Sequence, residues 1–89
     1  MAARAHVRVR GRVQGVGFRY DARTRARSLD LDGWIRNNSD GTVEAAFEGE
    51  KSRVDLAVSW CRRGPSAARV DDIDVEWEEP QGTVGFSVL

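Results

Sequence analysis

The sequence predicts an α+β fold in which two helices cover one face of an antiparallel β-sheet. Apolar residues recur at every second position in several segments, which is typical of half-buried strands. In two other segments they recur at spacings of three and four, which is typical of amphipathic helices. A chain of 89 residues buries roughly 64% of the surface that it exposes when unfolded. We therefore expect residues 1–89 to form one domain with its own core.

The first strand is predicted over residues 5–13, where apolar and basic side chains alternate. The inward set is Ala5, Val7, Val9 and Val13. The outward set is His6, Arg8, Arg10 and Arg12. Two glycines follow within residues 14–17 and permit backbone angles that other residues avoid. A helix is predicted to begin near Arg19 or Tyr20, and its buried stripe is Phe18, Ala22, Ala26 and Leu29.

Two more strands are predicted around a turn. The second strand is short and includes Trp34, Ile35 and Arg36, and residues 37–41 have the composition of a turn. The third strand alternates again. Its inward residues are Val43, Ala45 and Phe47. Its outward residues are Thr42, Glu44, Ala46 and Glu48.

A second helix and two strands complete the chain. Ser52 is the expected N-cap of the helix, and Gly64-Pro65 ends it. Its buried stripe is Val54, Ala57, Val58 and Cys61. The fourth strand directs Ile73, Val75 and Trp77 inward and Asp72, Asp74, Glu76 and Glu78 outward. After a turn at Gln81-Gly82, residues 84–88 form a short last strand.

This order of elements is the split β-α-β, ferredoxin-like arrangement. Its strand order is 4-1-3-2, with a short C-terminal strand in addition, so the first strand lies between the third and the fourth. The outward residues Arg8, Arg10 and Arg12 then face the acids Glu44, Glu48, Asp74, Glu76 and Glu78. Residues 1–27 carry a net charge of +7 and residues 28–89 a net charge of −7. The arrangement explains this asymmetry as a surface ladder of ion pairs, and it disfavours a nucleic-acid footprint.

Composition excludes several classes of protein. No apolar stretch approaches the roughly 20 residues that span a bilayer, and the first residues lack the apolar segment of a secretion signal. We therefore expect a cytoplasmic protein without a membrane partner. Cys61 is the single cysteine, which excludes an internal disulfide and a thiolate metal site. Cys61 is expected in the core, and His6 is expected to have no part in the chemistry.

Residues 14–19 form the most informative segment. A strand ends, two glycines follow, and a helix begins near Arg19. Main-chain N–H groups at such a glycine-opened helix start can surround an oxyanion. Arg19 adds a planar, permanently charged guanidinium that suits phosphate. The segment lacks the Gly-Lys-Ser/Thr of a nucleotide-binding P-loop and the third glycine of a dinucleotide site.

Two motifs in the chain resemble the signatures of the acylphosphatases. Residues 9–19, Val-Arg-Gly-Arg-Val-Gln-Gly-Val-Gly-Phe-Arg, are similar to the phosphate-loop signature of that family. Residues 33–37, Gly-Trp-Ile-Arg-Asn, followed by Gly41-Thr42-Val43 and Gly49, resemble its second signature. Ile35 departs from the smaller residue that the family usually has there. The resemblance covers essentially the whole chain and implies the ferredoxin-like fold that the periodicity also predicts.

The resemblance implies a small, free-standing acylphosphatase. Such an enzyme hydrolyses the carboxyl-phosphate bond of an acyl phosphate to a carboxylate and inorganic phosphate, without a metal or other cofactor. The arginine that matches Arg19 would bind the phosphoryl oxygens, and the asparagine that matches Asn37 would position the attacking water. The phosphate-binding loop would consist of Gln14, Gly15, Val16, Gly17, Phe18 and Arg19. We expect a monomer with no partner other than its small-molecule substrate.

Two alternatives remain open. One is an acylphosphatase-like domain that acts on carbamoyl phosphate in a maturation system, although such domains normally precede much longer chains. The other is an RNA-binding module, because RNA-recognition motifs share the layout and stack bases on aromatic residues of the first and third strands. The outward faces of those strands carry no Phe or Tyr here, which argues against RNA. Phe18, Trp60 and Trp77 are expected in the core, and whether Trp34 lines a cleft is left open.

Overall fold

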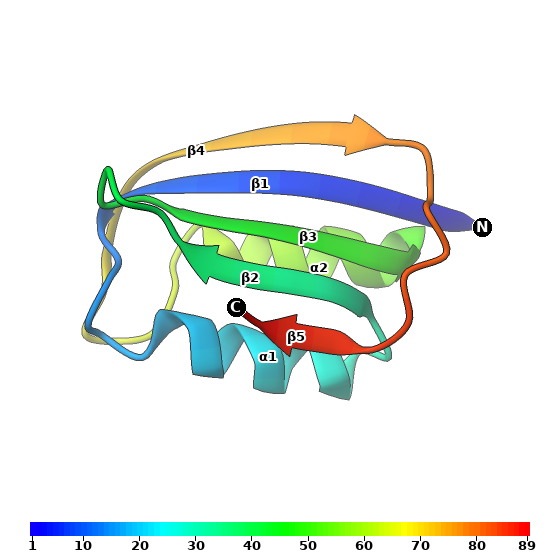
Figure 1. Ribbon diagram of the computed structural model, residues 1–89, viewed down its shortest axis with the longest axis horizontal. Coiled ribbons are helices and arrows are strands. Elements are labelled where there is room, and N and C mark those ends of the chain that lie inside the picture. The colour runs from blue at the N-terminus through cyan, green and yellow to red at the C-terminus, as the bar shows by residue number, and fades with distance from the viewer.

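The computed structural model describes residues 1–89. It consists of a five-stranded sheet with two helices against one face (Figure 1). The elements follow the predicted order: β1 (Ala2–Arg12), α1 (Phe18–Ser28), β2 (Asp32–Asn37), β3 (Val43–Glu50), α2 (Lys51–Cys61), β4 (Arg69–Glu78) and β5 (Phe86–Val88). The strands lie in the order β4-β1-β3-β2-β5. The ferredoxin-like fold class is confirmed. Neither helix is long and apolar enough to cross a membrane.

The sheet is antiparallel from β4 to β2, as predicted, whereas β5 pairs with β2 in parallel. The register aligns Gly33 with Phe86 and Ile35 with Val88. The reason is visible in Figure 1: β4 ends at the end of the sheet where β2 begins. The connecting residues 79–85 cross that end, so the chain then runs beside β2 in the same direction. The sheet is therefore mixed, with its one parallel pair at an edge.

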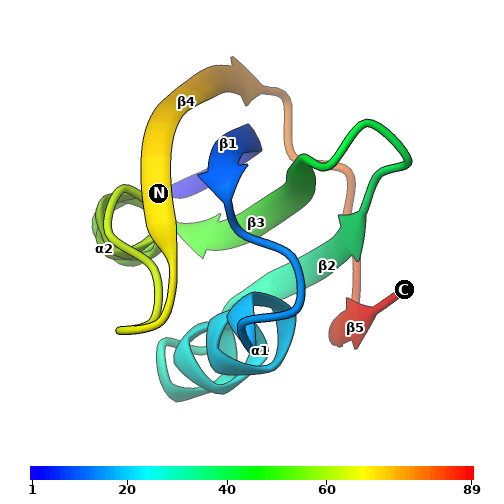
Figure 2. The ribbon, with the colours of Figure 1, turned by 90° about the vertical axis from the view of Figure 1, so that its left-hand side faces the viewer.

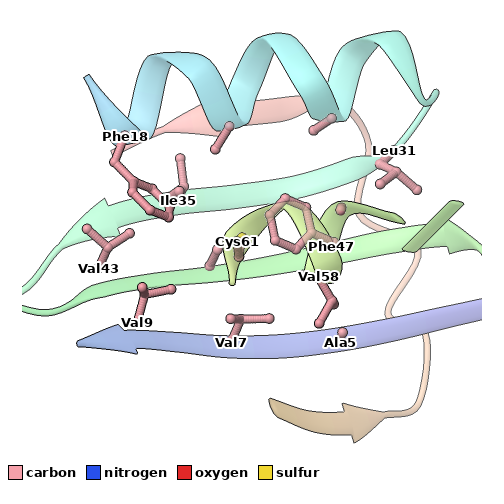
Figure 3. Close-up of a cluster of buried hydrophobic side chains, with 14 of the residues drawn as sticks. Ala5, Val7, Val9, Phe18, Leu31, Ile35, Val43, Phe47, Val58 and Cys61 are labelled. Atoms are coloured by element: carbon pink, nitrogen blue, oxygen red, sulfur yellow. The ribbon is translucent and has the colours of Figure 1, made fainter. Parts of the chain in front are cut away.

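The core lies between the sheet and the two helices (Figure 3). Phe18 points from the start of α1 toward the sheet, where Ile35 of β2 is fully buried. The predicted inward residues of β1, β3 and α2 are all buried: Ala5, Val7, Val9, Val13, Val43, Ala45, Phe47, Val54, Ala57, Val58 and Cys61. Burial raises the pKa of Cys61 to about 12. The thiol therefore stays protonated and packs as a small apolar side chain.

Two expectations about side chains were wrong. Trp77 is 48% exposed, because β4 is an edge strand and α2 covers this end of it only in part. The ammonium group of Lys51 lies over its ring in a cation–π contact, 4.3 Å from the ring centroid. Ser52 is not the N-cap of α2: Glu50 occupies that position and makes no side-chain capping bond. The helix begins directly where β3 ends, which leaves no turn for a capping serine.

The outer face of the sheet carries the predicted ladder of ion pairs, but its centre is buried. Glu44 and Glu48 of β3 are only 5% and 6% exposed, and Arg4 is 4% exposed. Arg4 donates to Glu48 at 2.9 Å and to Glu78 at 3.0 Å. The segment that leads to β5 folds over this pair, since the N–H groups of Gln81 and Gly82 also donate to Glu48.

Toward the end of β1 the ladder follows the expectation only in part. Arg10 pairs with Asp74 at 2.6 Å, as predicted. Arg12 forms no ion pair, because it lies beyond the last residue of β1 that pairs with β3 and stands opposite Arg69 of β4. The outer acids of β4 are largely exposed along the edge of the sheet.

Glu44 is the centre of this network and yields a pH prediction. Burial alone would raise its pKa, but hydrogen bonds from Asn38, His6 and Arg36 outweigh burial and lower the pKa from 4.5 to about 2. A carboxyl whose pKa is depressed on folding stabilises the fold above the unfolded pKa, and this contribution is lost as the pH falls through the folded pKa. We therefore expect the free energy of unfolding to drop by about 3 kcal/mol between pH 5 and pH 2 through this group.

Urea unfolding at a series of pH values measures the drop. Glu44→Gln should be less stable than the wild type at pH 7, and its stability should change less between pH 5 and pH 2. Parallel pH profiles for the two proteins would contradict the assignment of the drop to Glu44.

Candidate active site

One cleft contains both motifs. It has a volume of about 200 Å³ and lies where the segment after β1, the start of α1 and the end of β2 meet. Figure 2 views the molecule from this end of the sheet. The lining residues are Val13, Gly15, Gly17, Phe18, Arg19, Tyr20 and Asn37. No carboxylate and no histidine lines the cleft. Two grooves beside Trp60 on the helical face are somewhat larger, but neither Arg19 nor Asn37 lines them.

The main chain from Gly15 to the first turn of α1 carries unused hydrogen-bond donors beside this cleft. Gly15 and Gly17 have φ angles of 72° and 81°, and Gly17 is the left-handed N-cap of α1. None of the six main-chain N–H groups from Gly15 to Tyr20 donates to another group of the protein; the first to do so is that of Asp21, to the carbonyl oxygen of Gly17. Successive free N–H groups at a helix start form a concave site for an anion. We call residues 15–20 the amide nest.

Gly17 gives a prediction about this backbone. A Cβ at Gly17 would meet no atom within 4 Å, so Gly17→Ala adds no clash and only the left-handed backbone conformation opposes it. We expect Gly17→Ala to lower the free energy of unfolding by about 1–2 kcal/mol. Gly17→Asn should cost less, because asparagine tolerates this conformation. Chemical denaturation measures both, and equal losses for the two variants would contradict the backbone explanation.

Arg19 lies in the first turn of α1 and reaches across to the edge of the sheet. Its Nη1 donates to the carbonyl oxygen of Leu89 at 3.0 Å, and the N–H of Leu89 donates to Ile35 at 2.8 Å. Arg19 forms no ion pair with an Asp or Glu side chain, although several other arginines of the chain do. The remaining guanidinium donors are therefore free for an anion in the cleft.

Asn37 is the last residue of β2 and lines the cleft together with the helix start. Its Oδ1 is buried without a hydrogen-bond partner. Buried amide oxygens are almost always paired, so an unpaired one next to a cleft indicates a ligand or water position. The neighbouring Asn38 differs, because its Nδ2 donates to Thr42 Oγ1 at 3.0 Å and to Glu44 at 3.1 Å.

The other residues of the predicted loop have different surroundings. Phe18 is 2% exposed, packs edge-to-face against Trp60 and lies so close to Gly64 that a Cβ there would come within 2.6 Å of its ring. Val16 packs against the core. The side chain of Gln14 does not line the cleft, and its Nε2 donates to two main-chain carbonyl oxygens.

The sequence does not predict two of the lining residues, Val13 and Tyr20, and it leaves the position of Trp34 open. Val13 lines the cleft although its alternation predicted only a core position. Tyr20 is 57% exposed and lies at the mouth of the cleft. It could have been found from the sequence, because it is a large aromatic residue directly after Arg19 and outside the apolar stripe of the helix. Trp34 does not line the cleft. Its ring lies on the outer face of the sheet, beside His6 and under the guanidinium of Arg36.

Comparisons with known proteins agree with this geometry. The sequence model of the acylphosphatase family matches residues 5–88. The acylphosphatase of Roseiflexus sp. (strain RS-1) is 58% identical over 88 residues, which cover 98% of this chain and 95% of the relative. The crystal structure of the Bacillus subtilis acylphosphatase is 36% identical with a TM-score of 0.94 and coverage of 100% of this chain and 99% of that chain. T. kodakarensis HypF is 31% identical with a TM-score of 0.83, but the match covers 100% of this chain and only 12% of that chain. The chain belongs to the acylphosphatase family, the hydrolases of acyl phosphates.

Proposed function

We propose that the cleft binds the phosphoryl group of an acyl phosphate and that water attacks its phosphorus atom there. The bond between phosphorus and the bridging oxygen breaks, and the bond between phosphorus and the water oxygen forms. RCO–OPO₃²⁻ and H₂O become RCO₂⁻ and H₂PO₄⁻. The observation that carries the proposal is that the free amide nest, Arg19, which has guanidinium donors to spare beyond its bond to Leu89, and Asn37, whose Oδ1 is unpaired, line one cleft.

The amide nest and Arg19 would bind the phosphoryl oxygens together. The nest offers neutral donors in a fixed geometry, and the guanidinium offers a charged fork that can contact two oxygens. Phosphoryl transfer spreads negative charge over the equatorial oxygens in the transition state. Donors that are already oriented toward those oxygens stabilise this charge without reorganisation.

Asn37 would hold the attacking water on the opposite side of the phosphorus atom. Its amide has no other partner, so it is free to accept from water or donate to it. The leaving carboxylate is a stable anion that needs no general acid. A phosphoryl oxygen of the substrate can take the proton of the water, which fits a cleft without a carboxylate or histidine.

We also propose that hydrolysis needs no metal ion. The donors of the cleft are N–H groups, which bind anions and not cations. The acids at the centre of the outer face are engaged by arginines and main-chain N–H groups instead. Hydrolysis of benzoyl phosphate should therefore be the same with and without EDTA, and inorganic phosphate should inhibit competitively. A rate that collapses in EDTA and returns with Mg²⁺ would contradict this proposal.

The substrate class can be tested against the two alternatives. Benzoyl phosphate should be hydrolysed with a higher kcat/KM than carbamoyl phosphate, and the reverse order would favour a role in carbamoyl transfer. Single-stranded RNA should not bind in a filter assay, because Arg4, Arg8 and Arg10 on the outer face are paired with acids of β3 and β4.

The remaining expectations concern the state of the protein. We expect residues 1–89 to unfold as one cooperative unit, since all five strands share one sheet and one core. Sedimentation should give a monomer. The cytoplasmic location rests on the sequence, and cell fractionation tests it.

A further inference from the structure

The side chain of Gln14 joins two segments that are distant in the sequence and meet at the cleft. Its Nε2 donates to the carbonyl oxygen of Asn38 at 2.7 Å and to that of Thr42 at 2.9 Å. Both hydrogens of the amide nitrogen are therefore used. Gln14 directly precedes the amide nest, and Asn38 directly follows Asn37.

The segment on the far side of this contact behaves as one unit. The N–H of Asn38 donates to Thr42 at 2.9 Å, and the N–H of Gly41 donates to Asn38 at 3.2 Å. Asp40 accepts from both the N–H and the hydroxyl group of Thr42. These hydrogen bonds hold residues 38–42 together as a turn. If the carbonyl oxygens of Asn38 and Thr42 moved relative to Gln14, Asn37 would therefore move with them.

The segment on the near side has few ties of its own. The amide nest donates to no other protein group, and its two glycines place no side chain against a neighbour. Val16 and Phe18 fix the middle of the nest by packing against the core. Gly15, at its start, has no side chain that could pack, so the hydrogen bonds of the preceding Gln14 hold this end.

We propose that Gln14 is a positioning residue: its side-chain amide sets the separation between the amide nest and Asn37. The proposal rests on the proposed function, since it assigns the nest to the phosphoryl group and Asn37 to the water. Gln14 touches neither reacting group through its side chain. It acts by keeping the two at the spacing that in-line attack requires, and a misplacement of about 1 Å in such a site can cost about 100-fold in rate.

The test is a double-mutant cycle with Gln14→Met, which keeps the length of the side chain and removes both donors. We expect kcat for benzoyl phosphate to fall by about 10- to 100-fold, while the inhibition constant of inorganic phosphate changes by less than about 3-fold, because the nest still binds the anion. In an Asn37→Ala background the same substitution should lower kcat by less than about 3-fold, since the group that it positions is already gone.

Two controls keep the result interpretable. Gln81→Met is the same change at the only other glutamine, which is exposed and whose side chain makes no contact with the cleft; it should leave kcat unchanged. Gln14→Leu also removes both donors and adds no charge beside the anion site, and it replaces Gln14→Met if the latter unfolds. Urea denaturation of each variant shows that the comparison is between folded proteins.

Three outcomes would overturn the proposal: a wild-type kcat for Gln14→Met, full additivity with Asn37→Ala, or a phosphate inhibition constant that rises in step with the loss of kcat. The last would make Gln14 part of phosphate binding. A wild-type kcat for Asn37→Ala alone would instead refute the assigned role of Asn37, so failure of the proposed function is recognisable separately.

Discussion

Arg19→Lys should reduce kcat/KM for an acyl phosphate by at least about 10³-fold while the protein stays folded. Lysine keeps the positive charge but replaces the planar guanidinium fork with a compact ammonium, whose three N–H donors share one nitrogen. In the structure one arm of the Arg19 guanidinium is bound to Leu89, and Arg19 lines the cleft with its other donors unpaired. The single nitrogen of lysine cannot hold this bond and present a second pair of donors to two phosphoryl oxygens. Steady-state kinetics and urea denaturation measure the two effects.

Arg12→Lys is the matched control for Arg19→Lys. Arg12 is an exposed arginine at the end of β1, close in sequence to the cleft, and it forms no ion pair. Its replacement should change kcat/KM by less than about 3-fold, since the positive charge is kept and Arg12 does not line the cleft. Equal and mild losses for the two variants would mean that Arg19 contributes only to the general positive field of the N-terminal third.

Asn37→Ala should lower kcat by at least about 10²-fold, comparable with the loss of one oriented donor from an oxyanion site. The inhibition constant of inorganic phosphate should change far less, because the amide nest and Arg19 remain. The free energy of unfolding should stay the same or rise, since the substitution removes a buried oxygen that has no partner. Kinetics, phosphate inhibition and denaturation together test this combination.

Asn38→Ala should show the opposite combination. It removes the bonds to Thr42 and Glu44, so the free energy of unfolding should fall by about 1–2 kcal/mol, and the loss of kcat should be smaller than that of Asn37→Ala. If Asn37→Ala weakened phosphate binding and left kcat near normal, Asn37 would belong to the phosphate cradle and not to the water site.

Local periodicity was sufficient to predict the order of the elements and the faces of β1, β3 and α2 that pack in the core. In β1 the alternation of valines and arginines determines which side faces the helices, and Val7 and Val9 are fully buried as expected. The glycines before Arg19 predicted an open helix start, because few other residues adopt positive φ angles. Both signals depend only on residues that are close in the sequence, so the chain alone is enough to interpret them.

Features that depend on distant segments could not be predicted in the same way. Glu44 alternates like an exposed residue, yet side chains from β1 and β2 converge on it and bury it. Trp77 alternates like a core residue, yet it lies at an end of the sheet that α2 covers only in part. The partners of Gln14 lie 24 and 28 positions later in the chain. Periodicity carries no information about such contacts.

The position of β4 at the edge of the sheet affects how copies of this protein meet. An edge strand presents unpaired N–H and C=O groups that a second chain can extend into a continuous sheet. Here that edge carries acids at nearly every outward position: Asp72, Asp74, Glu76 and Glu78. Two such edges would bring like charges into contact, so at neutral pH edge-to-edge aggregation is opposed by repulsion. The opposite edge, β5, has only three residues and offers too short a template for the same association.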